Sequence, residues 1–437
     1  MPIFWEQLRG WTAIPDTFIR FFADEPGAFW LDRAVNPHSR YSVIGAGRVL
    51  GVREYSIADL REMLELFEQV GEQQAPPFDW RPGLVGCINY GSWQGSESTV
   101  SADLIWATRA FIFAHATRTM YFIGEFEDEV EFRDWFHAVL LRLALVGGDA
   151  AGYQLTRVPA KCQELDAAMK RSDYLGQITR AQNEISRGEV YQLCLTTQLS
   201  GKYTGDPLSY YLKLRGSHNA PFAAFIRAQR SYASISPEQL MTVVGTTVTS
   251  SPIKGTRPRG NSAEADATIS AELASNEKER AENLMIVDLV RNDLAVVCEA
   301  ASIRVSRLLE VEEHSTVFQL VSQITGELRP GSDALDALAS LFPAGSMTGA
   351  PKQRAIDLLD EIEPIQRGSY SGAIGYLAAS GDLELGMTIR TAVFDGDTVT
   401  LGIGGGITID SQPEAEHDEI VLKAAAHVDM LGATARW

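Results

Sequence analysis

The pattern of apolar and polar positions divides the chain into many short strand-like runs and a smaller number of helices. Before residue 146, apolar runs such as "YSVIGAG", "GLVGCINY" and "TMYFIGEF" have the length and composition of strands. Residues 56–70 instead space their apolar side chains three and four apart, which predicts a helix, and a second helix is predicted over residues 129–146.

From about residue 170, predicted helices alternate with predicted strands. The helices are expected at residues 173–187, 276–298, 351–361 and 413–431. The strands are expected at residues 190–200, 222–227, 231–235, 241–249, 315–328, 372–379, 383–394 and 398–404. Turns such as "ASGD" and "DGD" join neighbouring strands, and such hairpins favour antiparallel sheets with helices packed outside. We therefore predict an α+β fold.

The length and one small-residue segment bear on domain organisation. With 437 residues, of which 45% are hydrophobic, the chain is long enough for two or three domains or for one large unit. The segment "VGGDAAG", residues 146–152, is typical of a linker. We predict an N-terminal subdomain over residues 1–150 and a second domain over residues 151–437.

The charge of the chain restricts its partners. A net charge of −19 argues against nucleic acid, because binding to phosphates requires a basic surface. An acidic protein still binds a small anion where a local basic pocket or a bound metal offsets its field.

Cysteine usage and the absence of long apolar runs predict a cytoplasmic protein. Cys87, Cys162, Cys194 and Cys298 form no CxxC pair, which indicates reduced thiols and neither a disulfide framework nor a zinc site. The start "MPIFWEQLRGW" lacks the features of a secretory signal, and no stretch reaches the roughly 18–20 apolar residues of a membrane span. No membrane partner is expected.

Two predicted helices carry closely spaced carboxylates. Glu279 and Glu282 lie three apart on one face, and Glu416, Glu419 and Lys423 share a face of the last helix. Four carboxylates on two helices could converge on a hard cation such as magnesium. Spacing alone favours a different interpretation, in which acidic residues complement the helix dipole on a solvated face.

Three loops combine small residues with polar ones. In "LGIGGGITID" (401–410), four glycines within five positions allow close backbone approach and a concavity of N–H groups for an anion, although a tight turn explains them as well. The loop "PAGSMTGAP" leads into a helix whose free N–H groups favour anions. In "TSSPIKGTRPRG", Lys254 is either an exposed charge or a reactive side chain, and composition alone favours the exposed charge.

Nine sequence blocks, in the same order, resemble the chorismate-utilising enzymes, which include anthranilate, aminodeoxychorismate, isochorismate and salicylate synthases. The blocks are "GEVYQLCL", "SPEQL", "SPIKGTRPRG", "EKERAENLMIVDLVRND", "FPAGSMTGAPKQRA", "RGSYSGAIGYL", "TIRTAV", "GIGGGI" and "EHDEIVLKAAA". The blocks cover about residues 170–430, and "SRYSVIG" and "NAPFAAF" are similar more loosely. The resemblance implies the fold of anthranilate synthase component I, with large antiparallel sheets packed face to face and helices outside. Residues 151–437 would then form the chorismate-binding catalytic domain.

The resemblance implies one site for the acidic pairs and the glycine loop. Glu279, Glu282, Glu416 and Glu419 are expected to surround a magnesium ion (Mg2+), with Glu282 and Glu419 as its most direct ligands. The residues expected to hold the two carboxylates of chorismate are Thr348, Tyr370, Arg390, Gly404, Gly405, Gly406 and Lys423. Arg390 suits this role because its planar fork matches a carboxylate.

Three positions distinguish the reactions of this family. Isochorismate and salicylate synthases carry a lysine where this chain has Gln192, and a neutral glutamine cannot deprotonate an attacking water. Anthranilate synthases usually carry alanine where this chain has Lys254, whereas "PIKGT" resembles aminodeoxychorismate synthase component I. Glu238 matches the general acid of the family. The resemblance therefore implies conversion of chorismate to 4-amino-4-deoxychorismate, for 4-aminobenzoate and folate synthesis.

The implied chemistry uses Lys254 as a nucleophile. Its attack on C2 expels the C4 hydroxyl, and ammonia then attacks C4 and expels the lysine, so that one substitution becomes two. Glu238 would give a proton to the departing hydroxyl. The amine must be neutral to attack, and Arg257 and Arg259 would favour that form if they faced inward.

The source of ammonia and the exact reaction leave alternatives open. The chain shows no glutaminase motif, so a separate glutamine amidotransferase subunit is the expected partner. One alternative is an anthranilate-type synthase that carries a lysine. The other is a catalytically weak chorismate-binding subunit, which Gln319, Cys194 and Val296 would fit because relatives commonly carry histidine, asparagine and arginine there.

Overall fold

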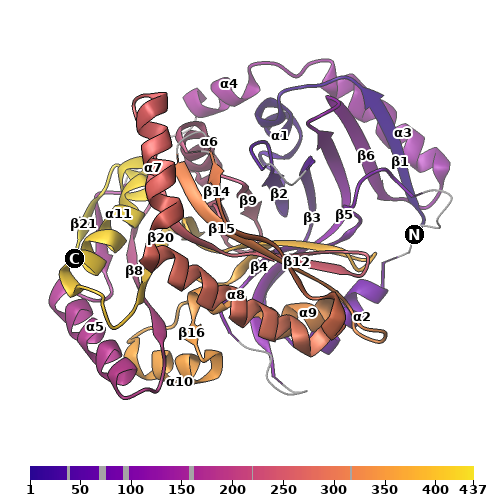
Figure 1. Ribbon diagram of the computed structural model, residues 1–437. Helices are drawn as coiled ribbons and strands as arrows, with labels where there is room; N and C mark the ends of the chain where they lie inside the picture. Colours follow the sequence, from indigo (N-terminus) through magenta and orange to yellow (C-terminus); the bar gives the residue numbers. More distant parts are fainter. Residues whose placement is uncertain (37–39, 68–74, 92–97, 157–161, 219, 315–316) are drawn as a thin grey trace.

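A computed structural model of the chain describes residues 1–36, 40–67, 75–91, 98–156, 162–218, 220–314 and 317–437. The strands lie at the centre with helices around them, and the two ends of the chain lie on opposite sides of the molecule (Figure 1). Ser39 and Asn219, which begin the loosely matching "SRYSVIG" and "NAPFAAF" segments, lie outside the described residues.

The strands are mostly short. In chain order they are β1 Ile3–Arg9, β2 Ala28–Asp32, β3 Tyr41–Tyr55, β4 Gly83–Ile88, β5 Val100–Ala114, β6 Thr119–Glu125, β7 Glu164–Ala167, β8 Gln192–Lys202, β9 Phe222–Arg227, β10 Ser231–Ser236, β11 Gln239–Val244, β12 Thr247–Ser251, β13 Ile253–Pro258, β14 Arg304–Glu313, β15 Val317–Glu327, β16 Gly349–Ala350, β17 Ala373–Ala378, β18 Leu383–Met387, β19 Thr391–Asp395, β20 Thr398–Ile407 and β21 Thr434–Arg436.

The helices fall between these strands. They are α1 Ile14–Phe22, α2 Ile57–Glu65, α3 Glu129–Leu143, α4 Asp149–Thr156, α5 Arg171–Ser186, α6 Pro207–Ser217, α7 Ala263–Ser275, α8 Glu277–Val297, α9 Ala334–Leu341, α10 Lys352–Ile362 and α11 Pro413–Leu431, with 3-10 turns η2 Ala300–Ser302 and η3 Gly345–Met347. No helix among the residues listed above is both long and apolar enough to cross a membrane.

The strands form one sheet that folds back on itself. Its hydrogen-bonded order is β8–β20–β19–β10–β9–β2–β3–β5–β4–β17–β18–β11–β12–β15, and β13 and β14 pair with β15. Between described strands, every pairing is antiparallel except that of β7 with β21. The two halves face each other around a core cluster that includes Phe29, Val85, Ile105, Ile226 and Tyr376.

Helices cover the outer faces of both halves. Phe18 of α1, Tyr174 of α5 and Ile420 of α11 belong to a cluster outside the half that contains β8 and β20. Ile286 of α8 and Leu338 of α9 belong to a cluster outside the other half. The predicted α+β fold, with antiparallel layers face to face and helices outside, is therefore confirmed.

Local backbone geometry explains where two strand predictions were wrong. Residues 383–394 form two strands because Arg390 has φ +49°, a left-handed conformation that interrupts the extended chain. Residues 241–249 likewise belong to a hairpin that turns at Gly245, with φ +60°. The predicted linker over residues 146–152 runs into α4, which begins at Asp149.

The two predicted domains exchange strand pairings. β2 pairs with β9 and β4 pairs with β17, so strands from residues 1–150 hydrogen-bond to strands from residues 151–437. The division at residue 150 stays a prediction about the chain, and the sheet itself continues across it.

Candidate active site

Lys254 and the glycine loop meet where the two ends of the folded sheet approach each other. β8 and β20 form one end, and β13 paired with β15 forms the other. A methyl group added at Gly406 would lie 2.2 Å from Gln192 Nε2 and 3.9 Å from Lys254 Nζ. A side chain at this position would displace the Gln192 amide, so the structure brings Lys254, Gln192 and Gly406 together across the gap between the sheet ends.

A bulge in β13 sets the direction of the Lys254 side chain. Lys254 lies opposite Leu320 of β15, and the register slips between Lys254 and Thr256. Gly255 at the slip has φ +75°, and an added methyl group would lie 3.1 Å from the Glu279 carboxylate. Bulges of this kind redirect side chains at functional sites. The direction of the Lys254 side chain therefore depends on the glycine that follows it.

Glu238 lies in the connection between β10 and β11 and is only 7% exposed. Burial raises the pKa of its carboxyl group, and this effect outweighs the charge of Lys254 and the hydrogen bonds from Ser346 and the Ile253 backbone, which lower it. A buried acid that keeps its proton beside a lysine is able to act as a proton donor.

The carboxylates of α8 and α11 share a lysine. Lys278 Nζ lies 3.9 Å from Glu282 and 3.9 Å from Glu416, whose side chains are 13% and 6% exposed. Ser411 also donates a 2.7 Å hydrogen bond to Glu416. Burial raises the pKa of Glu282, although Lys254 and Lys278 oppose the change.

The other two predicted metal ligands are paired with neighbouring cations. Glu279 lies 3.2 Å from Arg257, and Glu419 lies 2.7 Å from Lys423. Burial acts to raise the pKa of Glu419, but the charges of Lys423, Lys278 and Lys254 outweigh it, so the pKa is lowered. Each carboxylate thus already has a positive charge beside it.

These residues fit a hard cation, although they are not assembled around one. Within the described parts of the chain, no three His, Cys, Asp or Glu side chains converge as a metal site. The Lys278 ammonium instead lies within 3.9 Å of both Glu282 and Glu416, so carboxylates of two helices share one positive charge. Carboxylate oxygens are the ligands that magnesium prefers, so these side chains have the donor chemistry that a magnesium ion would need.

Lys423 and Arg390 form a positive group beside the glycine loop. Lys423 Nζ donates a 2.9 Å hydrogen bond to the Gly404 carbonyl, and Arg390 Nη1 donates one of 2.9 Å to the Lys423 carbonyl. Burial lowers the pKa of Arg390, against the influence of Tyr370 and Glu419. These contacts fix two cations next to backbone N–H groups, where a carboxylate is favoured.

The buried Thr348 and the half-buried Tyr370 form walls of the same region. Thr348 is fully buried, its hydroxyl donates to the Ala344 carbonyl at 3.1 Å, and its carbonyl accepts a 2.8 Å hydrogen bond from the Cys194 backbone. Tyr370 packs directly on Gly402, where an added methyl group would lie 2.1 Å from Tyr370 Cγ. Burial raises the pKa of the Tyr370 hydroxyl, so it stays a hydrogen-bond donor.

An arginine network that the sequence analysis missed holds these walls in place. Arg367, buried in the fold, donates to Glu363 at 2.7 Å and to the carbonyls of Met347 and Cys194 at 2.6 and 2.8 Å. Glu363 in turn accepts from the backbone and the hydroxyl of Thr196. The sequence does carry a signal for this pair, because "EPIQR" places opposite charges four residues apart.

A second missed pair anchors the loop "PAGSMTGAP". Lys352 Nζ lies 2.5 Å from Asp293 of α8 and donates to the Leu341 carbonyl at 3.1 Å. Burial raises the pKa of Asp293 to about 6, although Lys352 opposes this change. The pair joins the start of α10 to α8 and so fixes both ends of the loop that carries Ser346 and Thr348.

Two arginines expected near Lys254 lie elsewhere. Arg257 is paired with Glu272 and Glu279, at 3.0 and 3.2 Å. Arg259 is paired with Asp266 and, at 2.8 Å, with Glu313. The hypothesis that they face inward and favour a neutral Lys254 is wrong, because acidic residues of α7 and its neighbours hold their guanidinium groups.

The four cysteines are all buried and unbridged, which agrees with the sequence analysis.

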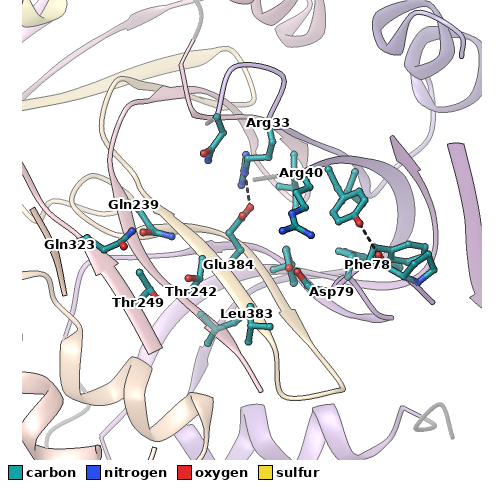
Figure 2. Close-up of a pocket in the computed structure, with 18 residues that line it drawn as sticks. Arg33, Arg40, Phe78, Asp79, Gln239, Thr242, Thr249, Gln323, Leu383 and Glu384 are labelled. Carbon is teal, nitrogen blue, oxygen red and sulfur yellow. Dashed lines mark hydrogen bonds and ion pairs between the residues drawn. The ribbon is translucent and has the colours of Figure 1, made fainter. Parts of the chain in front are cut away.

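A cavity of about 480 Å³ lies apart from this site, between the N-terminal strands and β11, β12 and β18. Figure 2 shows Arg33 and Glu384 paired within it, at 2.6 Å, with Arg40 and Asp79 nearby. None of the predicted site residues lines this cavity, although Gln239 in its lining directly follows Glu238 in sequence. We place the candidate active site at Lys254 because the reactive groups gather there.

Comparison with known proteins identifies the family. The family described as chorismate binding enzyme matches residues 20–429. The chain belongs to this family.

Within the family, the chain is similar to aminodeoxychorismate synthases and to anthranilate synthase component 1. It is 39% identical to aminodeoxychorismate synthase of Streptomyces griseus, over 81% of this chain and 51% of that protein. It is 35% identical to aminodeoxychorismate synthase of Streptomyces pristinaespiralis, over 98% of this chain and 66% of that protein. It is also 42% identical to anthranilate synthase component 1 of Arthrobacter globiformis, over 58% of this chain and 49% of that protein. The chain therefore spans about half to two thirds of the length of these relatives.

Solved structures of chorismate enzymes share the fold. Anthranilate synthase component I from Streptococcus pneumoniae TIGR4 has a TM-score of 0.74 at 26% identity and covers 90% of this chain and 92% of its own. The menaquinone-specific isochorismate synthase MenF from Escherichia coli has a TM-score of 0.74 at 17% identity, over 98% and 94% of the two chains, and supports the fold alone.

Opposite pKa shifts of two glutamates predict opposite effects of removing their charges. A raised folded-state pKa, as for Glu282, gives stability that is lost as pH rises through that pKa, so at pH 7 the charged Glu282 destabilises the metal-free protein. A lowered pKa, as for Glu419, gives stability that is present at pH 7 and lost on acidification.

Glu282→Gln should therefore raise the thermal midpoint at pH 7 without added metal, by a change in unfolding free energy on the order of 1 kcal/mol. Glu419→Gln should lower it. Thermal unfolding followed by circular dichroism measures both, and shifts of the same sign in both variants would contradict the electrostatic explanation.

Proposed function

We propose that this chain aminates chorismate at C4 to give 4-amino-4-deoxychorismate, the first step towards 4-aminobenzoate and folate. The observation that carries the proposal is the reactive lysine: the β13 bulge aims Lys254 across the gap at Gly406, next to the buried Glu238. Relatives named aminodeoxychorismate synthase at 39% and 35% identity support the same reaction.

Substrate binding uses the positive groups of an otherwise acidic protein. Lys423, Arg390 and the N–H groups of the Gly404–Gly406 loop are suited to one carboxylate of chorismate, with the buried Thr348 and the half-buried Tyr370 as walls. Glu282 and Glu416, with Glu279 and Glu419 beside them, would hold a magnesium ion. When bound, the ion neutralises these carboxylates and attracts the ring carboxylate of the substrate.

The reaction proceeds by two linked displacements. Neutral Lys254 attacks C2, the two ring double bonds shift, and the C4–O bond breaks as Glu238 protonates the departing hydroxyl to water. Ammonia then attacks C4, the double bonds shift back, and the C2–N bond breaks to release the lysine amine. One proton lost by ammonia returns to the site, so that chorismate and ammonia give the aminated product and water. Covalent attachment has divided one difficult substitution into two easier ones.

Gln192 favours ammonia over water as the nucleophile. Its side chain is 2% exposed, and its Oε1 has no hydrogen-bond partner among the described residues. A buried, unpaired acceptor beside Lys254 is suited to receive an N–H group, and an amide cannot deprotonate water. The glutamine therefore favours amination and disfavours hydration.

Ammonia would come from a glutamine amidotransferase partner, as the resemblance implies, and free ammonium would replace the partner in vitro. The second candidate reaction is anthranilate formation, because anthranilate synthase component 1 of Arthrobacter globiformis is 42% identical over 58% of this chain. In that reaction ammonia attacks C2 directly, and Lys254 has no covalent role.

The product of the purified protein tests the proposal. Chorismate, ammonium and magnesium should give 4-amino-4-deoxychorismate, because attack by Lys254 blocks C2 and leaves C4 for ammonia. Liquid chromatography with mass spectrometry separates this product from anthranilate by mass and retention. Anthranilate as the only nitrogen-containing product would disprove the proposal.

Removal of the nucleophile should abolish this product. Lys254→Ala should lower formation of the 4-amino product by about 10³-fold or more, the scale on which loss of a covalent nucleophile is felt. Lys202→Ala is a matched control, because Lys202 is an exposed strand lysine paired with Asp397. Intact-protein mass spectra should also show a chorismate-derived adduct on the wild type without ammonium and none on Lys254→Ala. An unchanged rate in Lys254→Ala would rule out the covalent role.

The pH dependence should report the proton held by Glu238. Burial raises the pKa of Glu238, so turnover should fall as pH rises through that raised pKa and the proton donor is lost. The Ser346 hydrogen bond lowers this pKa, so Ser346→Ala should move the alkaline limb of the kcat/KM profile to higher pH. Lys202→Ala again serves as control and should leave the profile in place. A limb that stays fixed in Ser346→Ala would mean that another group titrates there.

A further inference from the structure

Arg390, which the proposed function assigns to a substrate carboxylate, has an unusual backbone conformation. It lies between β18 and β19 with φ +49°, a left-handed conformation that residues with a side chain seldom adopt. Such conformations persist only where the surrounding structure fixes them. The contacts around Arg390 therefore indicate what holds its guanidinium in the direction of the site.

One turn of α11 contacts the side-chain end of Arg390. Arg390 Nη1 donates a 2.9 Å hydrogen bond to the Lys423 carbonyl, and Lys423 Nζ donates one of 2.9 Å to the Gly404 carbonyl. Residues four apart in an α-helix lie one above the other on the same face. His427 therefore follows Lys423 by one turn on the side of α11 that Arg390 contacts.

The His427 ring is buried and is oriented by a tyrosine of α6. His427 is 2% exposed, and its Nδ1 lies 2.6 Å from the Tyr210 hydroxyl. Burial raises the pKa of the Tyr210 hydroxyl, so this group keeps its proton and is able to donate it. When a hydroxyl donates to Nδ1 of a neutral imidazole, the ring proton lies on Nε2.

The second ring nitrogen lies where the Arg390 backbone offers an acceptor. His427 Nε2 is buried without a well-aligned hydrogen bond to any residue that the structure describes. The Arg390 carbonyl acts on the ring as a hydrogen-bond acceptor, which opposes the effect of burial on the pKa of His427. This carbonyl accepts a 3.0 Å hydrogen bond from the Ile235 N–H, and its second lone pair is able to accept another. Because an unpaired buried N–H group is costly, this acceptor is its natural partner.

The surroundings also keep His427 neutral. Burial, together with the charges of Arg390 and His218, lowers the pKa of His427 to about 3. A neutral imidazole presents an N–H group beside Arg390 without adding a second positive charge there.

We propose that His427 is a positioning residue for substrate binding: its Nε2–H group, set by Tyr210, holds the Arg390 carbonyl and keeps Arg390 in its left-handed conformation. The inference rests on the proposed binding of chorismate. The Lys423 carbonyl holds the guanidinium and His427 holds the backbone, so Arg390 is fixed at both ends. One turn of α11 thereby sets the direction of both cations that face the substrate carboxylate.

Loss of the N–H group should weaken chorismate binding and spare the chemical steps. His427→Phe keeps a flat ring and removes both nitrogens. At saturating ammonium, the KM for chorismate should rise about tenfold and kcat should change less than about twofold, because Arg390 binds ground state and transition state alike. His427→Gln places an amide N–H near the position of Nε2 and should return KM to within about threefold of the wild type. His137→Phe, at an exposed position of α3, is the matched control and should leave both constants unchanged.

The tautomer of His427 gives a signature that a merely structural role would not produce. Long-range ¹H–¹⁵N NMR of histidine-labelled protein should show one ring, absent from His427→Phe, that carries its proton on Nε2 alone from about pH 5 to about pH 8. Tyr210→Phe should remove this preference for Nε2 and raise the KM for chorismate by less than His427→Phe does. A proton on Nδ1 in the wild type would overturn the proposal.

The remaining outcomes separate positioning from folding and from the reaction. An unchanged chorismate KM in His427→Phe would overturn the positioning role, and so would a raised KM that His427→Gln leaves as high. If His427→Phe does not fold, the KM of His427→Gln and of Tyr210→Phe and the tautomer of the wild type decide the question. The shift of the thermal midpoint by chorismate and magnesium without ammonium measures binding whichever carbon is aminated. Anthranilate as the only product therefore refutes the proposed function, while this shift, compared between wild type and His427→Phe, still decides the role of His427. If chorismate does not shift the wild type and no product forms, both proposals are overturned.

Discussion

The approach of two sheet ends at the glycines of β20 is the constraint on which the site depends. A side chain at Gly406 would occupy the space of the Gln192 amide and contact Lys254, and a side chain at Gly402 would occupy the space of the Tyr370 ring. Because β20 has no side chains at these positions, groups from β8, β13 and the loop after α10 converge on one stretch of backbone. The folded-back sheet supplies the framework, since β20 and β13 belong to its opposite ends and meet only after the sheet closes. Lys254, which precedes Gly406 by 152 residues in sequence, is thereby brought into the same gap.

Charge balance is the second constraint, because the protein is acidic and the proposed substrate is a dianion. The site solves it locally: Lys278, Lys423, Arg390 and Lys254 all lie within reach of buried or half-buried carboxylates. The same field shifts the pKa values of the glutamates in opposite directions. Glu238 and Glu282 lie where burial is the stronger effect, and their pKa values rise, whereas Glu419 lies beside Lys423, and its pKa falls. A proton donor and charged ligands can therefore coexist within one pocket.

The sequence was sufficient for most helices and for the residue types of the site, and the reasons for its failures are physical. Periodicity predicted α5, α8, α10 and α11 to within two residues of each end, because each buries one apolar stripe. It failed at Arg390, where a non-glycine residue adopts φ +49° and divides one predicted strand into two, since no composition signal marks that conformation. Arg257 and Arg259 were expected at the lysine because they are near it in sequence, but acidic residues of α7 hold both guanidinium groups. The Arg367 network was missed because its partners, Cys194 and Met347, are backbone carbonyls, which side-chain identity does not reveal.

That network also explains what holds Tyr370 in the wall of the site. Arg367 fixes the chain three residues before Tyr370 by bonds to the carbonyls of Cys194 and Met347, so the backbone that carries the ring is tied both to β8 and to the loop of Thr348. The ring packs closely on Gly402, and its hydroxyl keeps its proton because burial raises its pKa. This wall of the site therefore depends on three backbone positions at once, namely the glycine beneath the ring and the two carbonyl oxygens that bind the guanidinium three residues earlier.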